Sequence, residues 1–226
     1  MNYVSITSTE PVVWHLTETL TKLLSEGKKT VWLLAGGSAI QIAADVSKNL
    51  VQQGADLSNL YVTLGDERYG ELGHADENWA QLQAAGFALP GAHVHRVLQQ
   101  GLSRAETTVV FGAKLHDWFS LADYRLGFLG IGPDGHTAGI KPHAFDMATM
   151  EYAAQYTGDD FERITMTPYA ISKLDEIVAC ATGESKTETL NRLVNEAVDV
   201  AVQPAQALKN VVNFTLYTNV TIEEDE

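Results

Sequence analysis

The segment YRLGFLGIGPDGHTAG, residues 124–139, carries the strongest structural signal in the chain. It begins as an apolar run, which predicts a buried β-strand, and continues as a loop rich in glycine. Gly130, Gly132 and Gly135 have the spacing G-x-G-x-x-G, which in dinucleotide-binding proteins joins a strand to a helix beneath a pyrophosphate. The same loop carries His136, whose side chain is suited to acid–base chemistry near neutral pH. The segment therefore has two interpretations, a nucleotide-binding turn or a turn that presents a catalytic histidine.

The sequence around this loop argues against the dinucleotide interpretation. A dinucleotide fingerprint usually occupies the first strand-to-helix turn, with an acidic residue about 20 positions further on at a strand end. Here the loop follows roughly the fourth predicted strand, and Glu151, at a suitable distance, lies in a stretch without a strand pattern. Pro133 and His136 are also unusual in a pyrophosphate turn. The glycines are better explained by a sharp turn that lets the backbone approach a ligand closely.

Short apolar segments alternate with amphipathic segments along the rest of the chain. We expect strands at residues 30–36, 59–66, 96–98, 124–132, 163–168, 175–183 and 211–218. We expect helices at residues 38–54, 77–86, 103–119 and 184–198. This alternation is typical of an α/β fold with a mostly parallel, Rossmann-like sheet and helices on both faces. Because no repeat or linker interrupts it, residues 1–226 are predicted to form a single domain with an acidic tail at residues 223–226.

Composition limits the classes of partner. The chain has 226 residues, and its formal net charge of −14 argues against a nucleic-acid partner, because that requires clustered Lys and Arg. No stretch approaches the roughly 20 apolar residues of a membrane span. Since a secretory signal pattern is also absent, we expect no membrane partner and a cytoplasmic location. The single cysteine, Cys180, excludes an intramolecular disulfide and lies in an apolar run that predicts a buried structural thiol.

In parallel α/β sheets, ligands bind at the carboxyl ends of the strands. The polar residues that directly follow the predicted strands should therefore converge on one site. These residues are Gly36–Gly37–Ser38, Asp66–Glu67–Arg68, Asp134–Gly135–His136–Thr137 and Gly183–Glu184–Ser185–Lys186.

Two of these turns have specific chemical interpretations. His136 follows a strand and has Asp134 beside it, so a general base is favoured over a residue that only caps local structure. If a helical turn starts there, its dipole favours the neutral imidazole that a base needs. Lys186 falls in the first turn of a predicted helix, where a cation is unfavourable unless an anion binds. Together with Arg68, this turn suggests a phosphate ligand, which needs only a few basic groups.

His93 and His95 could project to one face of a strand and bind a metal ion. No third ligand stands at a recognisable spacing, so we expect no metal site.

The ordered set LLAGGSA, GDER followed by Asn78, LGFLGIGPDGHTAG, RITMTP and TGESK resembles the motifs of 6-phosphogluconolactonases. That family is grouped with the glucosamine-6-phosphate isomerases/deaminases. The resemblance spans about residues 30–217, and DGHTA after a strand is its most specific element. It implies hydrolysis of the sugar phosphate lactone 6-phospho-D-glucono-1,5-lactone to 6-phosphogluconate, the second step of the pentose phosphate pathway, without a metal or organic cofactor.

The resemblance also implies roles for individual residues. His136 would be the general base that activates water, and Asp66 would orient the reacting groups. Arg68 and Lys186 would bind the phosphate. The other residues implied at the substrate are Gly36, Gly37, Ser38, Gly135, Thr137 and Arg163.

The chain departs from the family pattern on both sides of the implied site. Family members commonly continue GHTAS-L-F-P-G, whereas this chain has Gly139, Ile140, Lys141 and His143. After DER, Tyr69–Gly70 replaces the usual Val-Pro pair. These changes bear on the substrate and on efficiency more than on the fold, and Lys141 could add a phosphate contact.

Two other functions stay open at this point. Glucosamine-6-phosphate isomerases/deaminases share DGH but continue with Asn-Glu-Pro, whose glutamate assists ring opening. This chain has Ile140, Lys141 and Pro142 there, with no carboxylate. The other alternative is a phosphosugar-binding sensor without catalysis, which His136 and Asp66 disfavour but the altered flanking residues allow.

Overall fold

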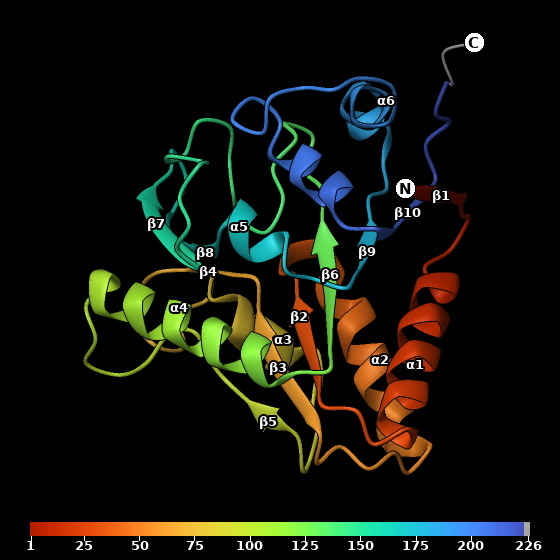
Figure 1. The fold of residues 1–226 in the computed structure, drawn as a ribbon, viewed down its shortest axis with the longest axis vertical. Coiled ribbons are helices and arrows are strands. Elements are labelled where there is room, and N and C mark those ends of the chain that lie inside the picture. Colours follow the sequence, from red (N-terminus) through yellow and green to blue (C-terminus); the bar gives the residue numbers. More distant parts are fainter. Residues whose placement is uncertain (224–226) are drawn as a thin grey trace.

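The computed structural model describes residues 1–223 and contains a seven-stranded sheet in which all neighbouring strands are parallel (Figure 1). Across the sheet the order is β1 (Asn2–Ser5), β10 (Asn213–Thr218), β9 (Glu176–Cys180), β6 (Tyr124–Gly130), β2 (Thr30–Leu34), β3 (Leu60–Leu64) and β5 (His93–Val94). The predicted parallel α/β sheet is confirmed. Of the predicted acidic tail, Glu223 is exposed, and residues 224–226 lie outside the described residues.

Helices connect the strands and enclose the sheet. The α-helices are α1 (Glu10–Ser25), α2 (Ile40–Gln52), α3 (Asn78–Ala84), α4 (Arg104–Leu121), α5 (Pro168–Ile171) and α6 (Thr187–Asn195). Short 3₁₀ segments are η1 (Gly37–Ala39), η2 (Glu184–Lys186) and η3 (Pro204–Asn210). All five residues of β2 are buried, as expected for a central strand covered on both faces.

The helices cover both faces because the connections run in both directions across the sheet. The connections through α1 and α2, from β1 to β2 and from β2 to β3, run toward the β5 edge. Those from β5 to β6, β6 to β9 and β9 to β10 run back toward β1. Parallel crossovers are right-handed, so opposite directions place helices on opposite faces. Figure 1 shows α1 and α2 side by side, with α4 in front of the sheet.

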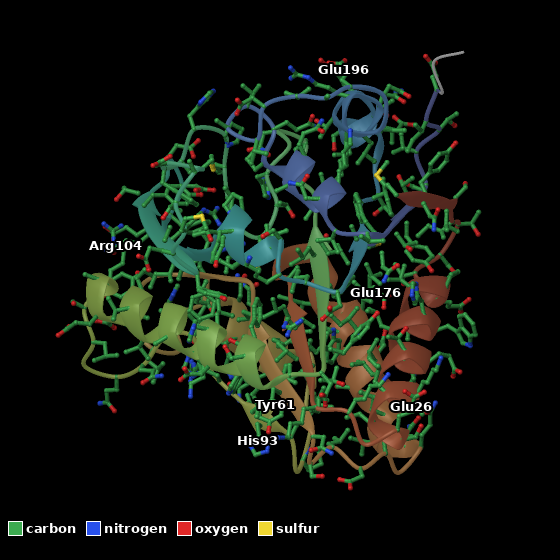
Figure 2. All side chains as sticks on the ribbon, viewed as in Figure 1. Glu26, Tyr61, His93, Arg104, Glu176 and Glu196 are labelled. Carbon is green, nitrogen blue, oxygen red and sulfur yellow. The ribbon has the colours of Figure 1, made fainter. Side chains whose placement is uncertain are left out.

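A second sheet, three-stranded and antiparallel, begins directly after β3. One residue after β3, β4 (Asp66–Arg68) pairs with β8 (Glu162–Met166), which pairs with β7 (Ala153–Thr157). In this register Arg68 lies opposite Arg163. Arg104, at the start of α4, donates to the carbonyl of Tyr156 at 3.3 Å and contacts the Glu162 carboxylate at 3.1 Å, which ties this sheet to α4 (Figure 2).

Several predicted elements differ from the structure. The strand expected at residues 163–168 exists, but it belongs to the antiparallel sheet. The strand expected at residues 96–98 is wrong: β5 lies three residues earlier, and Arg96 leaves the sheet to donate to Glu77. The helix expected at residues 184–198 is split into η2 and α6 and ends at Asn195. No helix begins at His136, because residues 131–152 form turns. The helix-dipole explanation for a neutral His136 is therefore wrong.

Three further elements, β1, α1 and β7, were not predicted from the sequence. All four residues of β1 are exposed, so this edge strand has no buried face to mark it. In contrast, α1 has a clear signal, since Val12, Leu16 and Leu20 recur at helical spacing and are buried.

The structure shows the surroundings of Cys180 and His93, two residues that the sequence singled out. The Cys180 thiol is buried, as predicted, and burial raises its pKa. His93 stacks on Tyr61 with ring centroids 4.5 Å apart (Figure 2). Within residues 1–223, no group of three or more His, Cys, Asp or Glu side chains is arranged to hold a metal ion. No helix in the same part of the chain is long and apolar enough to cross a membrane.

His95 gives the fold a pH-dependent stability. The residue is 8% exposed, and its ring lies near Phe111 and Trp118. Burial, and secondarily the charge of Lys114, lowers its pKa from 6.5 to about 4. Below pH 6.5 the unfolded chain binds a proton that the folded chain binds only near pH 4, so stability falls as the pH falls through this window.

We predict that the His95→Phe variant removes this component. The wild type should lose about 2 kcal/mol more than the variant in its free energy of unfolding between pH 7 and pH 5. Urea unfolding at both pH values measures the difference. Parallel pH profiles for the two proteins would show that His95 does not titrate in this way.

Candidate active site

A cavity of about 340 Å³ lies at the carboxyl ends of the central strands. Of the predicted site residues, the structure brings together Gly36, Gly37, Ser38, Asp66, Arg68, His136, Arg163 and Lys186. The turns after β2, β3, β6 and β9 each contribute, as the carboxyl-end rule predicts. Three polar or aromatic side chains that were not predicted from the sequence to belong to the site also line the cavity, and they are Asn78, Asp160 and Phe161.

Two predicted residues lie outside the lining. Thr137 is fully buried, and its hydroxyl donates to the carbonyl of Gly130 at 2.7 Å, which closes the turn after β6. Gly135 has a φ of +81° and packs against Gln203. Both residues shape the loop that presents His136.

The His136 ring is held in place by Asp134 and by Gly132. Its Nδ1 lies 2.5 Å from Oδ1 of Asp134, and the His136 backbone N–H donates to the same oxygen at 3.2 Å. The ring packs directly over Gly132, where a β-carbon would lie 2.0 Å from Cε1. The hydrogen bond from His136 lowers the pKa of Asp134 to about 2, so Asp134 stays ionised. Nε2 makes no hydrogen bond with any described residue and is available to a ligand.

Asp66 is a buried carboxyl group at the same cavity. Burial raises its pKa, an effect that the charges of Arg163, His136 and Arg68 oppose. Its Oδ2 lies 3.8 Å from a guanidinium nitrogen of Arg163. The close packing of Asp66 on the loop after β6 requires Gly139, where a β-carbon would lie 2.4 Å from Oδ2 and φ is +70°. The sequence departure at position 139 therefore makes room for Asp66.

Glu67 and Asn78 fix the strand that carries Asp66. The buried Glu67 carboxylate accepts backbone N–H bonds from Arg68 at 2.8 Å, Asn78 at 2.7 Å and Trp79 at 3.0 Å. Burial raises its pKa to about 8 against these donors, which favour the ionised form. The Asn78 side chain donates to the carbonyl of Asp66 at 3.2 Å. Glu67 thus binds β4 to the start of α3 and does not line the cavity.

The cavity has three cationic side chains with different partners. The Lys186 amino group makes no hydrogen bond or ion pair with any described residue, and burial lowers its pKa. The Arg68 guanidinium donates only to a backbone carbonyl, that of Asp76 at 3.2 Å, and lies over the Phe161 ring. Arg163 donates to the Asp160 carboxylate at 2.8 Å. Lys141 does not line the cavity, because it pairs with Asp159 and Asp160.

The comparisons with known proteins show the family and the fold. Residues 8–216 match the model of a family described as glucosamine-6-phosphate isomerases/6-phosphogluconolactonase. A Haemophilus influenzae protein named 6-phosphogluconolactonase is 25% identical over 223 residues, which cover 92% of each chain.

Solved structures show the same fold. A 6-phosphogluconolactonase from Shewanella baltica superposes with a TM-score of 0.79 at 19% identity, covering 96% of this chain and 97% of the other. A monomeric glucosamine-6-phosphate deaminase has the same TM-score of 0.79 at 15% identity, covering 96% of this chain and 97% of its own. At these identities the likeness concerns the fold, and it does not separate the two activities.

We predict that Gly132→Ala breaks the contact between His136 and Asp134, because the new methyl group takes the space of the ring. Nitrogen NMR of the histidine rings should show loss of the hydrogen-bonded Nδ1–H signal. Gly130→Ala is the matched control, since a β-carbon at Gly130 meets no atom within 4 Å. If both variants keep the wild-type signal, the packing of His136 on Gly132 is not tight.

Proposed function

This chain belongs to the family of glucosamine-6-phosphate isomerases and 6-phosphogluconolactonases, and on that premise we propose that it is a 6-phosphogluconolactonase. It would hydrolyse 6-phospho-D-glucono-1,5-lactone to 6-phosphogluconate. The observation that carries the proposal is the His136–Asp134 pair, which faces a cavity that also holds two cations without a carboxylate partner.

The position of the hydrogen bond supports His136 as the general base. With Nδ1–H donated to Asp134, the neutral ring keeps an unprotonated Nε2, which is the atom free to accept a proton. Asp134 also stabilises the imidazolium that forms when that proton is accepted. In this pair the Asp134 carboxylate fixes the tautomer of the His136 ring. A helix dipole, which the sequence suggested for keeping the ring neutral, is not needed.

The proposed reaction uses one water molecule and no other reactant. Nε2 of His136 takes a proton from water while the water oxygen attacks C1 of the lactone, which gives a tetrahedral oxyanion. The oxyanion collapses, the bond from C1 to the ring oxygen breaks, and the ring oxygen takes the proton from the imidazolium. The products are the C1 acid and a free hydroxyl group. Asp66 would orient the sugar hydroxyls beside the reacting carbon.

Binding of its phosphate group can orient the substrate in the cavity. Lys186 and Arg68 support this role because neither is neutralised by a carboxylate among the described residues. The η1 turn, with Gly37 and Ser38 at the cavity, adds backbone polar groups from the first residues after β2. A remote anchor of this kind fixes the lactone carbonyl relative to His136.

The alternatives in this family predict other chemistry. A deaminase would need an acid–base group for ring opening, and the positions after DGHTA hold Ile140, Lys141 and Pro142. A sensor would bind the phosphosugar without turnover. The oriented base at the cavity favours hydrolysis over both.

We predict that the protein accelerates hydrolysis of freshly generated lactone in proportion to its concentration. Glucose-6-phosphate dehydrogenase would supply the lactone, and 6-phosphogluconate dehydrogenase would report the acid, with spontaneous hydrolysis as the background. Ammonia release from glucosamine 6-phosphate should be absent. A rate equal to background contradicts the proposal, and ammonia release would assign the deaminase activity.

We also predict that His136→Ala lowers kcat by about 10² to 10⁴, the range of a single general base. Affinity for 6-phosphogluconate should stay within about threefold, because the phosphate anchors are intact. His116→Ala is the control, since His116 also contacts a neighbouring aspartate, Asp117, but on the exposed surface of α4. Equal kcat values for His136→Ala and wild type would remove His136 from the mechanism.

Lys186→Met should raise KM by at least about tenfold, because a charge-assisted contact to the phosphate is lost. Lys173→Met, which removes an exposed lysine over Tyr169, controls for net charge. Similar KM values for the two variants would place the phosphate elsewhere.

A further inference from the structure

Arg163 differs from the other two cations of the cavity in being neutralised. Its guanidinium donates to Asp160 at 2.8 Å and lies 3.8 Å from Asp66, so both of its charged partners are carboxylates. The Nε atoms of Arg163 and Arg68 are both buried and have no hydrogen-bond partner within residues 1–223. In contrast to Arg163, the Arg68 guanidinium and the Lys186 amino group make no ion pair with a carboxylate in the same part of the chain.

The Asp160 carboxylate is held firmly in this position. It lies at the tip of the β7–β8 hairpin, where its Oδ1 accepts the backbone N–H of Phe161 at 2.8 Å. Its Oδ2 contacts Arg163, and the amino group of Lys141 lies 3.2 Å from the same oxygen. Lys141 stands where family members commonly have Phe, so this second cation is a feature of the present chain. Asp160 nevertheless lines the cavity, with its side chain 38% exposed.

The cations enter the cavity from different strands of the sheet. Lys186 follows β9, which pairs with β6, whereas Arg163 is carried by β8 through its pairing with β4, the continuation of β3. These elements flank the central pair β6 and β2 on opposite sides. Arg68, on β4, lies directly opposite Arg163, so these two cations stand on one side of the crevice and Lys186 on the other. A phosphate held between Arg68 and Arg163 would be displaced from Lys186, and the sugar would be displaced with it.

We propose that Asp160 is a specificity-determining residue that neutralises Arg163 and so directs the anionic group of the substrate to Lys186 and Arg68. This inference rests on the proposed function, because it assumes a substrate with one phosphate and one reacting carbonyl. Asp160 lowers the affinity of the cavity for anions and in return excludes a displaced, unreactive binding mode in which the phosphate lies between Arg68 and Arg163. Lys141 holds the carboxylate in place through the same oxygen that contacts Arg163.

Asp160→Asn tests the proposal, because the amide oxygen still accepts the Phe161 N–H while Arg163 loses its closer carboxylate partner and keeps only Asp66, at 3.8 Å. Asp159→Asn is the matched control: it removes the same charge one residue away, from a side chain that is 82% exposed and contacts only Lys141 in this network. Calorimetry with inorganic phosphate measures anion affinity, and initial rates on the lactone give kcat and KM. Thermal unfolding checks that both variants are folded.

We expect Asp160→Asn to bind inorganic phosphate about tenfold more tightly than the wild type. Unreactive binding lowers kcat and KM by the same factor, so both should fall about fivefold while kcat/KM stays within about twofold. Asp159→Asn should match the wild type in all three quantities. A phosphate affinity no greater than that of Asp159→Asn, an unchanged kcat, or a loss of kcat/KM would each overturn the inference.

The two proposals fail separately. If the wild type does not accelerate lactone hydrolysis, the proposed function is wrong, but the phosphate titrations still decide whether Asp160 neutralises Arg163. If the wild type is active and Asp160→Asn binds phosphate like the control, the lactonase proposal stands and the role of Asp160 is wrong.

Discussion

The reversal of connection direction between β2 and β6 is the constraint on which the site depends. These strands are neighbours in the sheet, but the chain leaves β2 toward β3 and leaves β6 toward β9. Their following loops must therefore separate, and a crevice opens between them at the carboxyl edge. The glycine turn after β2 and the His136 loop after β6 line the two sides of this crevice. The antiparallel sheet then adds Asp66, Arg68 and Arg163 from the β3 side.

Close contact with glycine sets the positions of two titratable side chains of the cavity, His136 and Asp66. The His136 ring lies over Gly132, and the Asp66 carboxylate lies against Gly139, in each case closer than any β-carbon would allow. Gly132 belongs to the glycine spacing that resembles a dinucleotide fingerprint, yet no helix follows it to receive a pyrophosphate. In this chain the glycine at position 132 instead makes room for the His136 ring. Gly139, a departure from the family pattern, leaves the space that the Asp66 carboxylate occupies.

Local sequence patterns were sufficient to predict the central strands and the turns that follow them. A strand buried on both faces is a short apolar run, and its glycine-rich end lies within the next few residues of the sequence. Local patterns were insufficient for the antiparallel sheet, since the pairing of β4 with β8 joins segments far apart in the chain. Asp160 and Phe161 reach the cavity only through that pairing, and nothing around them in the sequence marks a site. The sequence shows Asp134 beside His136. The neutral form of the His136 ring was nevertheless attributed to a helix dipole and not to the hydrogen bond with Asp134. The turn chemistry of residues 131–152, which contain no helix, became evident only from the fold.

The most direct measurement is a crystal structure of the protein with 6-phosphogluconate bound. The geometry predicts the C1 carboxyl group within about 3 Å of Nε2 of His136, the distance of a hydrogen bond to the reacting centre. We expect the phosphate on Lys186 and Arg68, with Arg163 still paired with Asp160. A product displaced from Lys186, with its phosphate between Arg68 and Arg163 and its carboxyl group remote from His136, would contradict this assignment of the site.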